Sequence, residues 1–172
     1  MNAKYEIFNT ESNDLKFIYT MFEEAIDYIK RNNYVGWTTY EKQYLIKDLK
    51  NKLQFKVISD KDILAVFSIA FIDALIWREM ENGDAIYLHR IVVNPKFKGQ
   101  KQFEKILNWV RKIATEKELK YIRLDTWADN PNIIEYYKSF GFIYLKNYTT
   151  PNTKELPKQH RNLKLALLEM KL

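Results

Sequence analysis

Residues 85–127 hold the pattern that most restricts what this chain can fold into: two apolar runs separated by a basic loop and a long amphipathic segment. The run 85–93 predicts a strand. The segment after the loop, to about Lys117, carries apolar side chains at helical spacing and predicts a helix. Residues 121–127 alternate apolar and polar side chains, which predicts a second strand. Two strands joined through a helix pair in parallel, so the centre of the chain predicts a crossover unit in a sheet covered by helices.

The flanking sequence predicts more strands and helices around this unit. Apolar residues recur at helical spacing in residues 13–31, which predicts a first helix. A Thr38-x-x-Glu41 capping box predicts the start of a second helix, which runs to about Leu53. Residues 73–84 predict a loop with about one helical turn. The remaining expected strands are residues 5–8, 55–59, 63–72, 142–148 and 162–172, which gives an α/β fold with a mixed sheet of about seven strands in one domain, residues 1–172.

Composition limits the function classes. The chain has no cysteine, which excludes disulfides, thiolate metal ligands and a cysteine nucleophile. The N-terminus has no apolar core of signal-peptide length, and no apolar run is long enough to span a bilayer, so we expect a soluble cytoplasmic protein with no membrane partner. The formal net charge of +6 suits nucleic acid and a polyphosphate cofactor equally well. No nucleic-acid-binding motif occurs, so we expect no nucleic-acid partner.

The loop before the central helix contains four lysines and one glycine. Lys96, Lys98, Lys101 and Lys105 surround the expected start of the helix, and Gly99 lies among them. A helix N-terminus presents unpaired backbone N–H groups and a partial positive charge, so this loop suits a diphosphate. Lysines at a helix start are also commonly a solvated surface, and the loop alone does not separate the two interpretations.

A second motif, N-P-x-x-I-x-x-Y-x-x-x-G-F, spans residues 130–142. Asn130 suits a helix cap, Pro131 the first turn and Gly141 the exit, so a helix is predicted here. Together with the preceding strand, V-x-P turn and basic loop, this motif makes the chain resemble the GNAT superfamily of N-acetyltransferases over residues 86–142. The resemblance implies transfer of an acetyl group from acetyl-CoA to an amine. It also implies a strongly twisted sheet with helices on both faces, splayed between strands four and five.

The resemblance implies a set of site residues as well. Asn130 would contact CoA, and Tyr137 would protonate the departing CoA thiolate as a general acid. The residues themselves are equally compatible with Asn130 as a plain cap and Tyr137 as a core aromatic. By the same match, the backbone of Ile91 and Val93 would bind the pantetheine amides. The complete expected cofactor-binding set is Ile91, Val92, Val93, Lys98, Gly99, Gln100, Lys101, Gln102, Phe103, Asn130, Ile133 and Tyr137.

The basic loop departs from the family pattern R/Q-x-x-G-x-G/A. Lys98, Lys101 and Phe103 occupy its three defined positions, and only Gly99, an extra glycine often seen beside the first position, fits. Backbone donors are available whatever the side chain, and Lys98 supplies charge without the two-pronged geometry of arginine. Phe103 opposes close approach of the diphosphate unless its ring turns inward beneath the helix. This departure motivates an alternative hypothesis, a catalytically idle acyl-CoA-binding or sensor protein of the same fold.

His89 is the candidate general base, acting directly or through water. It lies on the fourth expected strand, near where the resemblance puts the acceptor amine, and histidine titrates near neutral pH. A single histidine on a strand is more often a structural hydrogen-bonding group. The only other histidine is His160, and no zinc-ligand spacing occurs, so no metal site is expected. Without cysteine a thioester intermediate on the protein is impossible, which favours direct attack by the amine.

Aromatic residues are the candidates for acceptor binding. Trp37, Tyr40, Trp77 and Trp127 fall in segments that the resemblance puts on the acceptor side. Large aromatics are mostly core residues, and we expect about half of these to be so. A pocket lined by aromatics suits an apolar or a cationic amine. The expected acceptor is therefore a small-molecule or peptide amine, and the expected oligomeric state is a monomer or a homodimer.

Overall fold

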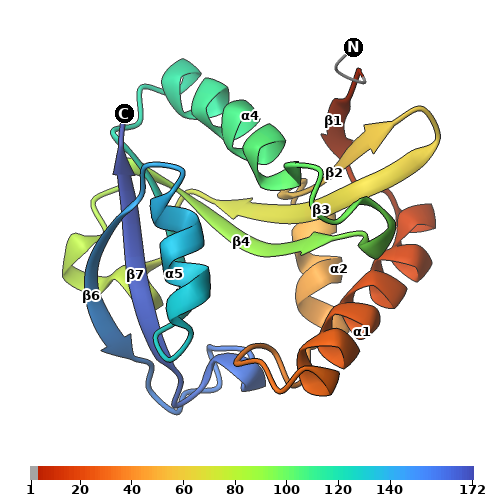
Figure 1. Ribbon diagram of the computed structural model, residues 1–172. Coiled ribbons are helices and arrows are strands. Elements are labelled where there is room, and N and C mark those ends of the chain that lie inside the picture. Colours follow the sequence, from red (N-terminus) through yellow and green to blue (C-terminus); the bar gives the residue numbers. More distant parts are fainter. Residues whose placement is uncertain (1–3) are drawn as a thin grey trace.

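The structure, a computed structural model, describes residues 4–172 and contains one mixed sheet with helices on both faces (Figure 1). The strands are β1 (Glu6–Asn9), β2 (Gln54–Ser59), β3 (Asp62–Ala70), β4 (Ala85–Val93), β5 (Tyr121–Trp127), β6 (Ile143–Thr149) and β7 (Lys164–Lys171). The helices are α1 (Leu15–Arg31), α2 (Lys42–Lys50), α3 (Ala74–Trp77), α4 (Gln102–Glu116) and α5 (Pro131–Lys138). Short 3-10 turns occupy Ser12–Asp14, Arg78–Met80, Pro95–Phe97 and Lys158–His160. The predicted α/β class and the prediction of about seven strands are both confirmed.

The strand order in the sheet is β1-β2-β3-β4-β5-β7-β6. β4 and β5 pair in parallel, as their helical connection predicts, and the other neighbours pair antiparallel. The predicted bounds of these two central strands are the observed ones. The sequence analysis did not specify that β7, which follows β6 in the chain, lies between β5 and β6.

The predicted capping box at the start of α2 is wrong. The helix begins at Lys42, with Glu41 as its N-cap in an extended conformation and no capping bond from a side chain. The Glu41 carboxylate instead accepts hydrogen bonds from the backbone N–H of Lys158, at 2.8 Å, and from the Gln43 side chain, at 3.2 Å. A contact with a distant loop therefore takes the side chain that the local motif would have used.

Each face of the sheet is covered by a different pair of helices. α4 and α5 lie on one face, where Phe103, Ile106 and Val110 of α4 belong to the largest apolar cluster. α1 and α2 lie on the other face, where Ile18, Phe22 and Leu45 form a separate cluster with Val66 and Val92. Figure 1 shows α4 on one side of β3 and β4 and the pair α1 and α2 on the other. Because both faces are covered, the central strands are buried on both sides.

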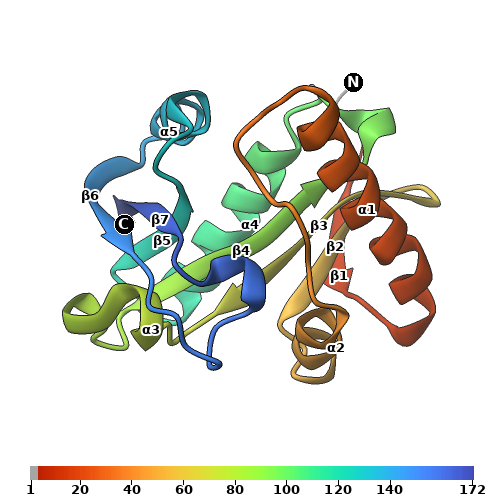
Figure 2. The same cartoon turned by 90° about the horizontal axis from the view of Figure 1, so that it is seen from below.

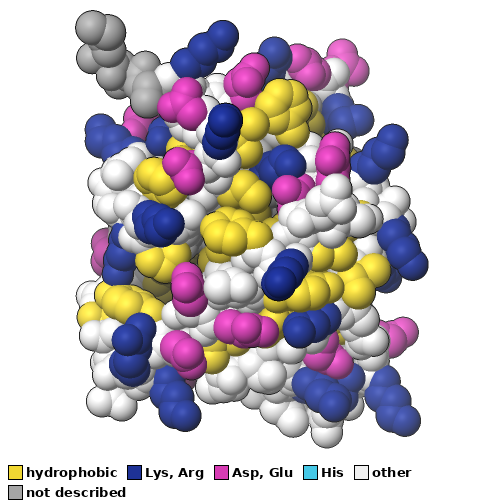
Figure 3. All heavy atoms as spheres, turned by 90° about the vertical axis from the view of Figure 1, so that its right-hand side faces the viewer, with side chains coloured by type: hydrophobic (Ala, Val, Ile, Leu, Met, Phe, Trp, Pro, Cys, Tyr) yellow, Lys and Arg dark blue, Asp and Glu magenta, His cyan; other side chains and the backbone are white. Residues whose placement is uncertain are grey.

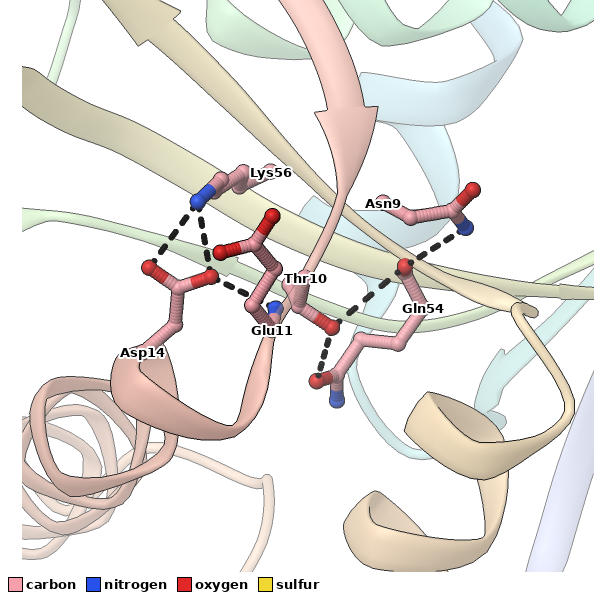
Figure 4. Close-up of polar contacts among 6 residues, drawn as sticks. All are labelled: Asn9, Thr10, Glu11, Asp14, Gln54 and Lys56. Carbon is pink, nitrogen blue, oxygen red and sulfur yellow. Dashed lines mark hydrogen bonds and ion pairs between the residues drawn. The ribbon is translucent and has the colours of Figure 1, made fainter.

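The start of α1 is fixed to β2 by a group of polar contacts (Figure 4). Lys56 on β2 donates to both carboxylate oxygens of Asp14, at 2.9 and 2.7 Å. The hydroxyl of Thr10, which is buried, donates to the side-chain oxygen of Gln54 at 2.9 Å. The side chains of Asp14 and Lys56 are largely buried, so this ion pair is screened less than a surface pair. These contacts hold the first long helix against the sheet.

β4 and β5 separate partway along their length. Their paired positions run from Ala85 and Tyr121 to Leu88 and Leu124, and both strands continue beyond the last pair. Arg90 on β4 has a φ of +51°, and the pairing of β4 with β3 shifts register opposite it. An extra residue of this kind bends a strand and strengthens its twist. The expected splay between the fourth and fifth strands is therefore present, with Leu88 and Leu124 at its closed end.

Among residues 4–172, no helix is both long and apolar enough to cross a bilayer. The face on which α1 lies carries lysine and arginine interspersed with aspartate and glutamate (Figure 3). The chain has a net charge of +6, but the positive side chains on this face are not gathered into a single basic patch.

Candidate active site

A cavity of about 210 Å³ opens at the splay between β4 and β5. Its lining combines residues from both strands, from the start of β7, from α1 and α5, and from two connecting segments. The lining residues are Ala25, Ile29, Trp37, Leu88, His89, Arg90, Ile91, Val92, Val93, Leu124, Asp125, Thr126, Trp127, Ile133, Tyr137, His160, Leu163 and Leu165. The cavity therefore lies where the sheet's own hydrogen bonding is interrupted.

His89 and Asp125 are the first residues beyond the last paired position of β4 and β5. The Nδ1 atom of His89 lies 4.0 Å from Oδ1 of Asp125, and its Nε2 atom lies 3.4 Å from Oδ2 of Asp73, which precedes α3. One ligand-capable atom from each of the three residues lies within 4.8 Å of the other two. The three side chains thus form one polar cluster, in which no hydrogen bond joins Oδ2 of Asp73 to His89.

Burial shifts the titration of all three groups. It lowers the pKa of His89 to about 3, with Arg90 and His160 adding to the shift. Burial raises the pKa of Asp125 to about 6, against the opposing effect of Arg90. Burial also raises the pKa of Asp73 to about 8, and the neighbouring carboxyl of Asp125 raises it further. At neutral pH His89 is therefore uncharged, Asp73 is mostly protonated and Asp125 is mostly ionised.

Arg90 is paired with a buried carboxylate on α2. Its Nε atom donates to Oδ2 of Asp48 at 2.9 Å, and its Nη2 atom donates to the same oxygen. Asp48 is 8% exposed, so the pair is largely desolvated. The pair holds the bent part of β4 against α2, and the guanidinium still lowers the pKa of His89 and opposes the upward shift of the Asp125 pKa.

Tyr137 lines the cavity from α5, on the other face of the sheet from His89. Burial raises its pKa, with smaller contributions from Tyr136 and Asp125. Its phenol is therefore fully protonated at neutral pH, as a proton donor requires. Ile133, one helical turn earlier, lines the same cavity.

The basic loop lies outside this cavity, at the start of α4. Gly99 has a φ of +79°, and Lys101, the N-cap of α4, has a φ of +54°. Lys101 thus adopts the left-handed conformation at a position where the family pattern has glycine. Lys98 packs over the ring of Tyr28 on α1, with its ammonium 3.7 Å from the ring centroid. The departure in sequence has left the glycine-like backbone conformation in place.

The ring of Phe103 turns inward beneath α4, the condition that the sequence analysis set for close approach. The residue is 3% exposed, and its ring packs edge-on to Tyr137 and Phe140, with centroids 5.0 and 4.9 Å away. Tyr136 and Phe142 complete the contacts. The large side chain therefore fills the interior between α4 and α5 and does not cover the loop.

Asn130 caps α5 and also contacts a distant segment. Its Oδ1 atom accepts from the backbone N–H of Ile133 at 3.2 Å, and its Nδ2 atom donates to the carbonyl of Val35 at 2.9 Å. Val35 belongs to the α1–α2 segment (residues 32–41), which Figure 2 shows crossing in front of β4. Asn130 does not line the cavity.

Two of the four aromatic candidates for acceptor binding line the cavity. Trp37 and Trp127 meet edge-on, with centroids 5.8 Å apart. Tyr40 packs against Phe22, and its hydroxyl donates to Glu23. Trp77 is 1% exposed and belongs to a separate apolar cluster with Tyr87. Tyr40 and Trp77 therefore do not line the candidate acceptor site.

Asp73, Asp125 and Arg90 were not singled out by the sequence analysis. Asp125 alternates with the apolar residues of its strand, a pattern that suggests a solvated face. The available signal was topological, because a strand in the middle of a sheet covered on both faces has no solvated side. A carboxylate at such a position is uncommon and points to a functional site.

A sequence model of the acetyltransferase (GNAT) family matches residues 19–142. A curated relative, the uncharacterized N-acetyltransferase YesJ of Bacillus subtilis (strain 168), is 30% identical over 73 residues. That match covers 42% of this chain and 41% of the relative, so it spans less than half of the relative's length.

Solved structures with the same architecture cover nearly the whole chain. An acetyltransferase of the GNAT family from Listeria monocytogenes 4b F2365 superposes with a TM-score of 0.78 at 16% identity, over 98% of this chain and 95% of that one. The protein yncA from Salmonella typhimurium, with its cofactor acetyl-CoA, superposes with a TM-score of 0.66 at 13% identity, over 99% of this chain and 95% of that one. At such identities the likeness concerns the fold.

Proposed function

The chain belongs to the acetyltransferase (GNAT) family, and on this premise we propose that it transfers the acetyl group of acetyl-CoA to a primary amine by direct attack. The observation that carries the proposal is the cavity at the splay, which has a protonated phenol, Tyr137, on one side and the His89 cluster on the other. An acid for the leaving group and a basic group for the amine are the two functions that such a transfer requires.

The fit of acetyl-CoA to this chain is supported by two features of the backbone. Beyond Leu88, β4 has no strand partner on its β5 side, so backbone groups there, those of Ile91 and Val93 among them, are free for pantetheine. Gly99 and Lys101 both have positive φ, and the loop is surrounded by lysines that suit a diphosphate. Gln102 and the inward-turned Phe103 contribute backbone N–H groups at the same helix start, whereas the N–H of Gln100 donates to the carbonyl of Phe97 at 3.4 Å.

In the proposed mechanism acetyl-CoA supplies a reactive thioester, and the protein supplies position and protons. A backbone N–H of β4 near Ile91 polarises the thioester carbonyl. His89 and its neighbours receive the amine on one face of the sheet, and Tyr137 protonates the thiolate from the other. Trp37 and Trp127 flank the acceptor and exclude water from it. The acceptor is a small-molecule or peptide amine.

Calorimetric titration with acetyl-CoA, followed by an acetylation assay on a panel of primary amines, tests this proposal. We expect micromolar binding and amide formation. Tyr137→Phe should lower kcat by about 100-fold or more while the Kd for acetyl-CoA stays nearly unchanged, because only the proton is removed. Equal turnover by the phenylalanine variant would overturn the role of Tyr137. Binding with no acetylation of any amine would instead favour an idle acyl-CoA binder.

A further inference from the structure

We infer that Asp125 is a further catalytic residue, which receives the ammonium group of the acceptor and takes a proton from it. This inference rests on the proposed acetyl transfer. Asp125 lies on β5 immediately beyond the last paired position of the splay and lines the cavity together with His89 and Tyr137. Arg123, two residues earlier, bonds to Tyr87 on β4, so alternation along β5 puts Asp125 on the face where the His89 cluster lies.

The charges around Asp125 leave it as the anion of the site. On β4, His89 is uncharged at neutral pH, and the guanidinium of Arg90, paired with Asp48 on α2, favours the ionised form of Asp125. Asp73, before α3, is mostly protonated because its pKa is raised to about 8. From the remaining elements, His160 is also uncharged, since burial lowers its pKa to about 4, and Tyr137 on α5 is a neutral phenol. The cluster therefore presents a single negative charge, which matches the single positive charge of a primary ammonium group.

His89 alone is a poor proton acceptor in this surrounding. Burial and Arg90 lower its pKa to about 3, whereas the pKa of Asp125 is about 6. A base works best when its pKa lies near the working pH. His89 is then a positioning residue, set between Asp73 at its Nε2 atom and Asp125 at its Nδ1 atom.

Asp125 and Tyr137 together account for the two protons that the amine loses. A primary ammonium group loses two protons when its nitrogen forms the C–N bond of the amide and the C–S bond of the thioester breaks. Asp125 accepts the first proton before attack, which frees the lone pair, and later returns it to solvent. Tyr137 gives its phenolic proton to the departing sulfur and regains the second proton from the nitrogen. No oxidant, reductant or metal is required.

The test is the pH dependence of kcat/KM for an acceptor amine, measured with butylamine, benzylamine and phenethylamine. Such amines titrate near pH 9 to 10, about as lysine does. If Asp125 takes the proton, the wild-type profile rises through about pH 6 and is level from about pH 7 to 9, because the ammonium form is the substrate. If the site accepts only free amine, kcat/KM continues to rise about tenfold per pH unit over that range, because the fraction of free amine does so.

Asp125→Asn should lower kcat/KM by about 100-fold at pH 7, remove the level region and leave the Kd for acetyl-CoA unchanged. Asp129→Asn is the matched control, because Asp129 lies four residues after Asp125, exposed in the connection between β5 and α5, and it should behave as wild type. His89→Gln should lower activity but keep the level region.

The outcomes separate the two proposals. If the wild-type enzyme is active and the Asp125→Asn variant is equally active, the assignment of Asp125 alone is overturned. Loss of activity on adding a chelator also overturns it, because Asp125 would then be a metal ligand. Wild-type protein that binds acetyl-CoA but acetylates none of the amines overturns both proposals. If Asp125→Asn does not fold, the wild-type profile still decides, because a continuous rise from pH 6 to 9 is incompatible with a carboxylate base.

Discussion

The side chain of Asn130 joins the first turn of α5 to the carbonyl of Val35, a residue 95 positions earlier in the chain. The same amide accepts the N–H of Ile133, so one residue both caps the helix and holds the α1–α2 segment. The edge-on contact of Trp37 with Trp127 and the bond from Lys158 to Glu41 hold that segment at two further points. One wall of the candidate acceptor site is therefore fixed by contacts with the C-terminal half of the sheet.

Replacing Asn130 should separate its two roles. Asn130→Ala removes the cap and the bond to Val35, and should lower the free energy of unfolding by about 1 to 2 kcal/mol. Asn130→Asp keeps an acceptor for Ile133 and loses only the donor, so about 1 kcal/mol of that loss should be restored. Urea denaturation measures both values. Equal stability of the alanine and aspartate variants would show that the cap contributes nothing.

The protein should be more stable with glycine at position 101 than with alanine. Its φ of +54° is unfavourable for any residue with a Cβ atom, by about 1 to 2 kcal/mol. Its side chain is 80% exposed and pairs only with Glu104, so truncation by itself costs little. Lys101→Gly should therefore exceed Lys101→Ala by about 1 kcal/mol in free energy of unfolding. Two variants of equal stability, measured by thermal and urea unfolding, would contradict a strained backbone at this position.

Phe103→Ala should destabilise the protein by about 3 to 5 kcal/mol, because it leaves a void among four aromatic rings. Phe103→Leu retains most of the volume and should cost about 1 to 2 kcal/mol. Phe17 on α1 is 42% exposed, so Phe17→Ala is the matched control and should change stability by less than about 1 kcal/mol. A small loss for Phe103→Ala in urea denaturation would mean that the ring does not lie inside.

Stability should fall as pH rises from 7 to 8, and Asp73 is the cause. Its pKa is about 8 in the folded protein against 3.8 for an unperturbed aspartate, so the folded state holds a proton that the unfolded state has lost. This contribution is complete below pH 3.8 and is lost as pH rises through 8. Asp125, Glu81 and Arg90 face the carboxyl and set this shift together with burial.

Asp73 dominates the window from pH 7 to 8. The pKa of Asp125 is about 6, so its contribution is complete below this range. Burial lowers the pKa of His89 to about 3 and that of His160 to about 4, so both histidines raise stability with pH until an unperturbed histidine has titrated near pH 6.5. The decline from pH 7 to 8 should therefore be about 0.5 kcal/mol per pH unit, below the one-proton limit of about 1.4. Asp73→Asn should flatten the profile of free energy of unfolding against pH, and a wild-type profile that is already flat would contradict the protonated carboxyl.

Local signals in the sequence predicted the central elements well. β4 and β5 are long apolar or alternating runs bounded by turns, and α5 has a cap, a first-turn proline and an exit glycine that agree with one another. The start of α2 was mispredicted because the carboxylate of Glu41 bonds to Lys158, a contact between residues far apart in the chain. The position of β7 is likewise set by pairing across the sheet, which no local pattern encodes.

The candidate site was predicted only in part, for a related reason. Tyr137, Ile133, His89, Trp37 and Trp127 were singled out and do line the cavity. Asp125 was not singled out, since alternation alone cannot tell which faces of a strand are covered. The inward turn of Phe103 depended on the rings that α5 and the connection after it bring beneath α4, and these come from sequence more than 30 residues away.

The position of β7 between β5 and β6 has a consequence for folding of the nascent chain. On the ribosome β6 emerges before β7, so it has no neighbour to pair with, and β5 presents an open edge until β7 arrives. Unpaired strand edges of this kind are sites of misassembly in nascent and refolding chains. Pairing of β7 with both neighbours closes these two edges at once, so the sheet cannot be completed before β7 has been synthesised.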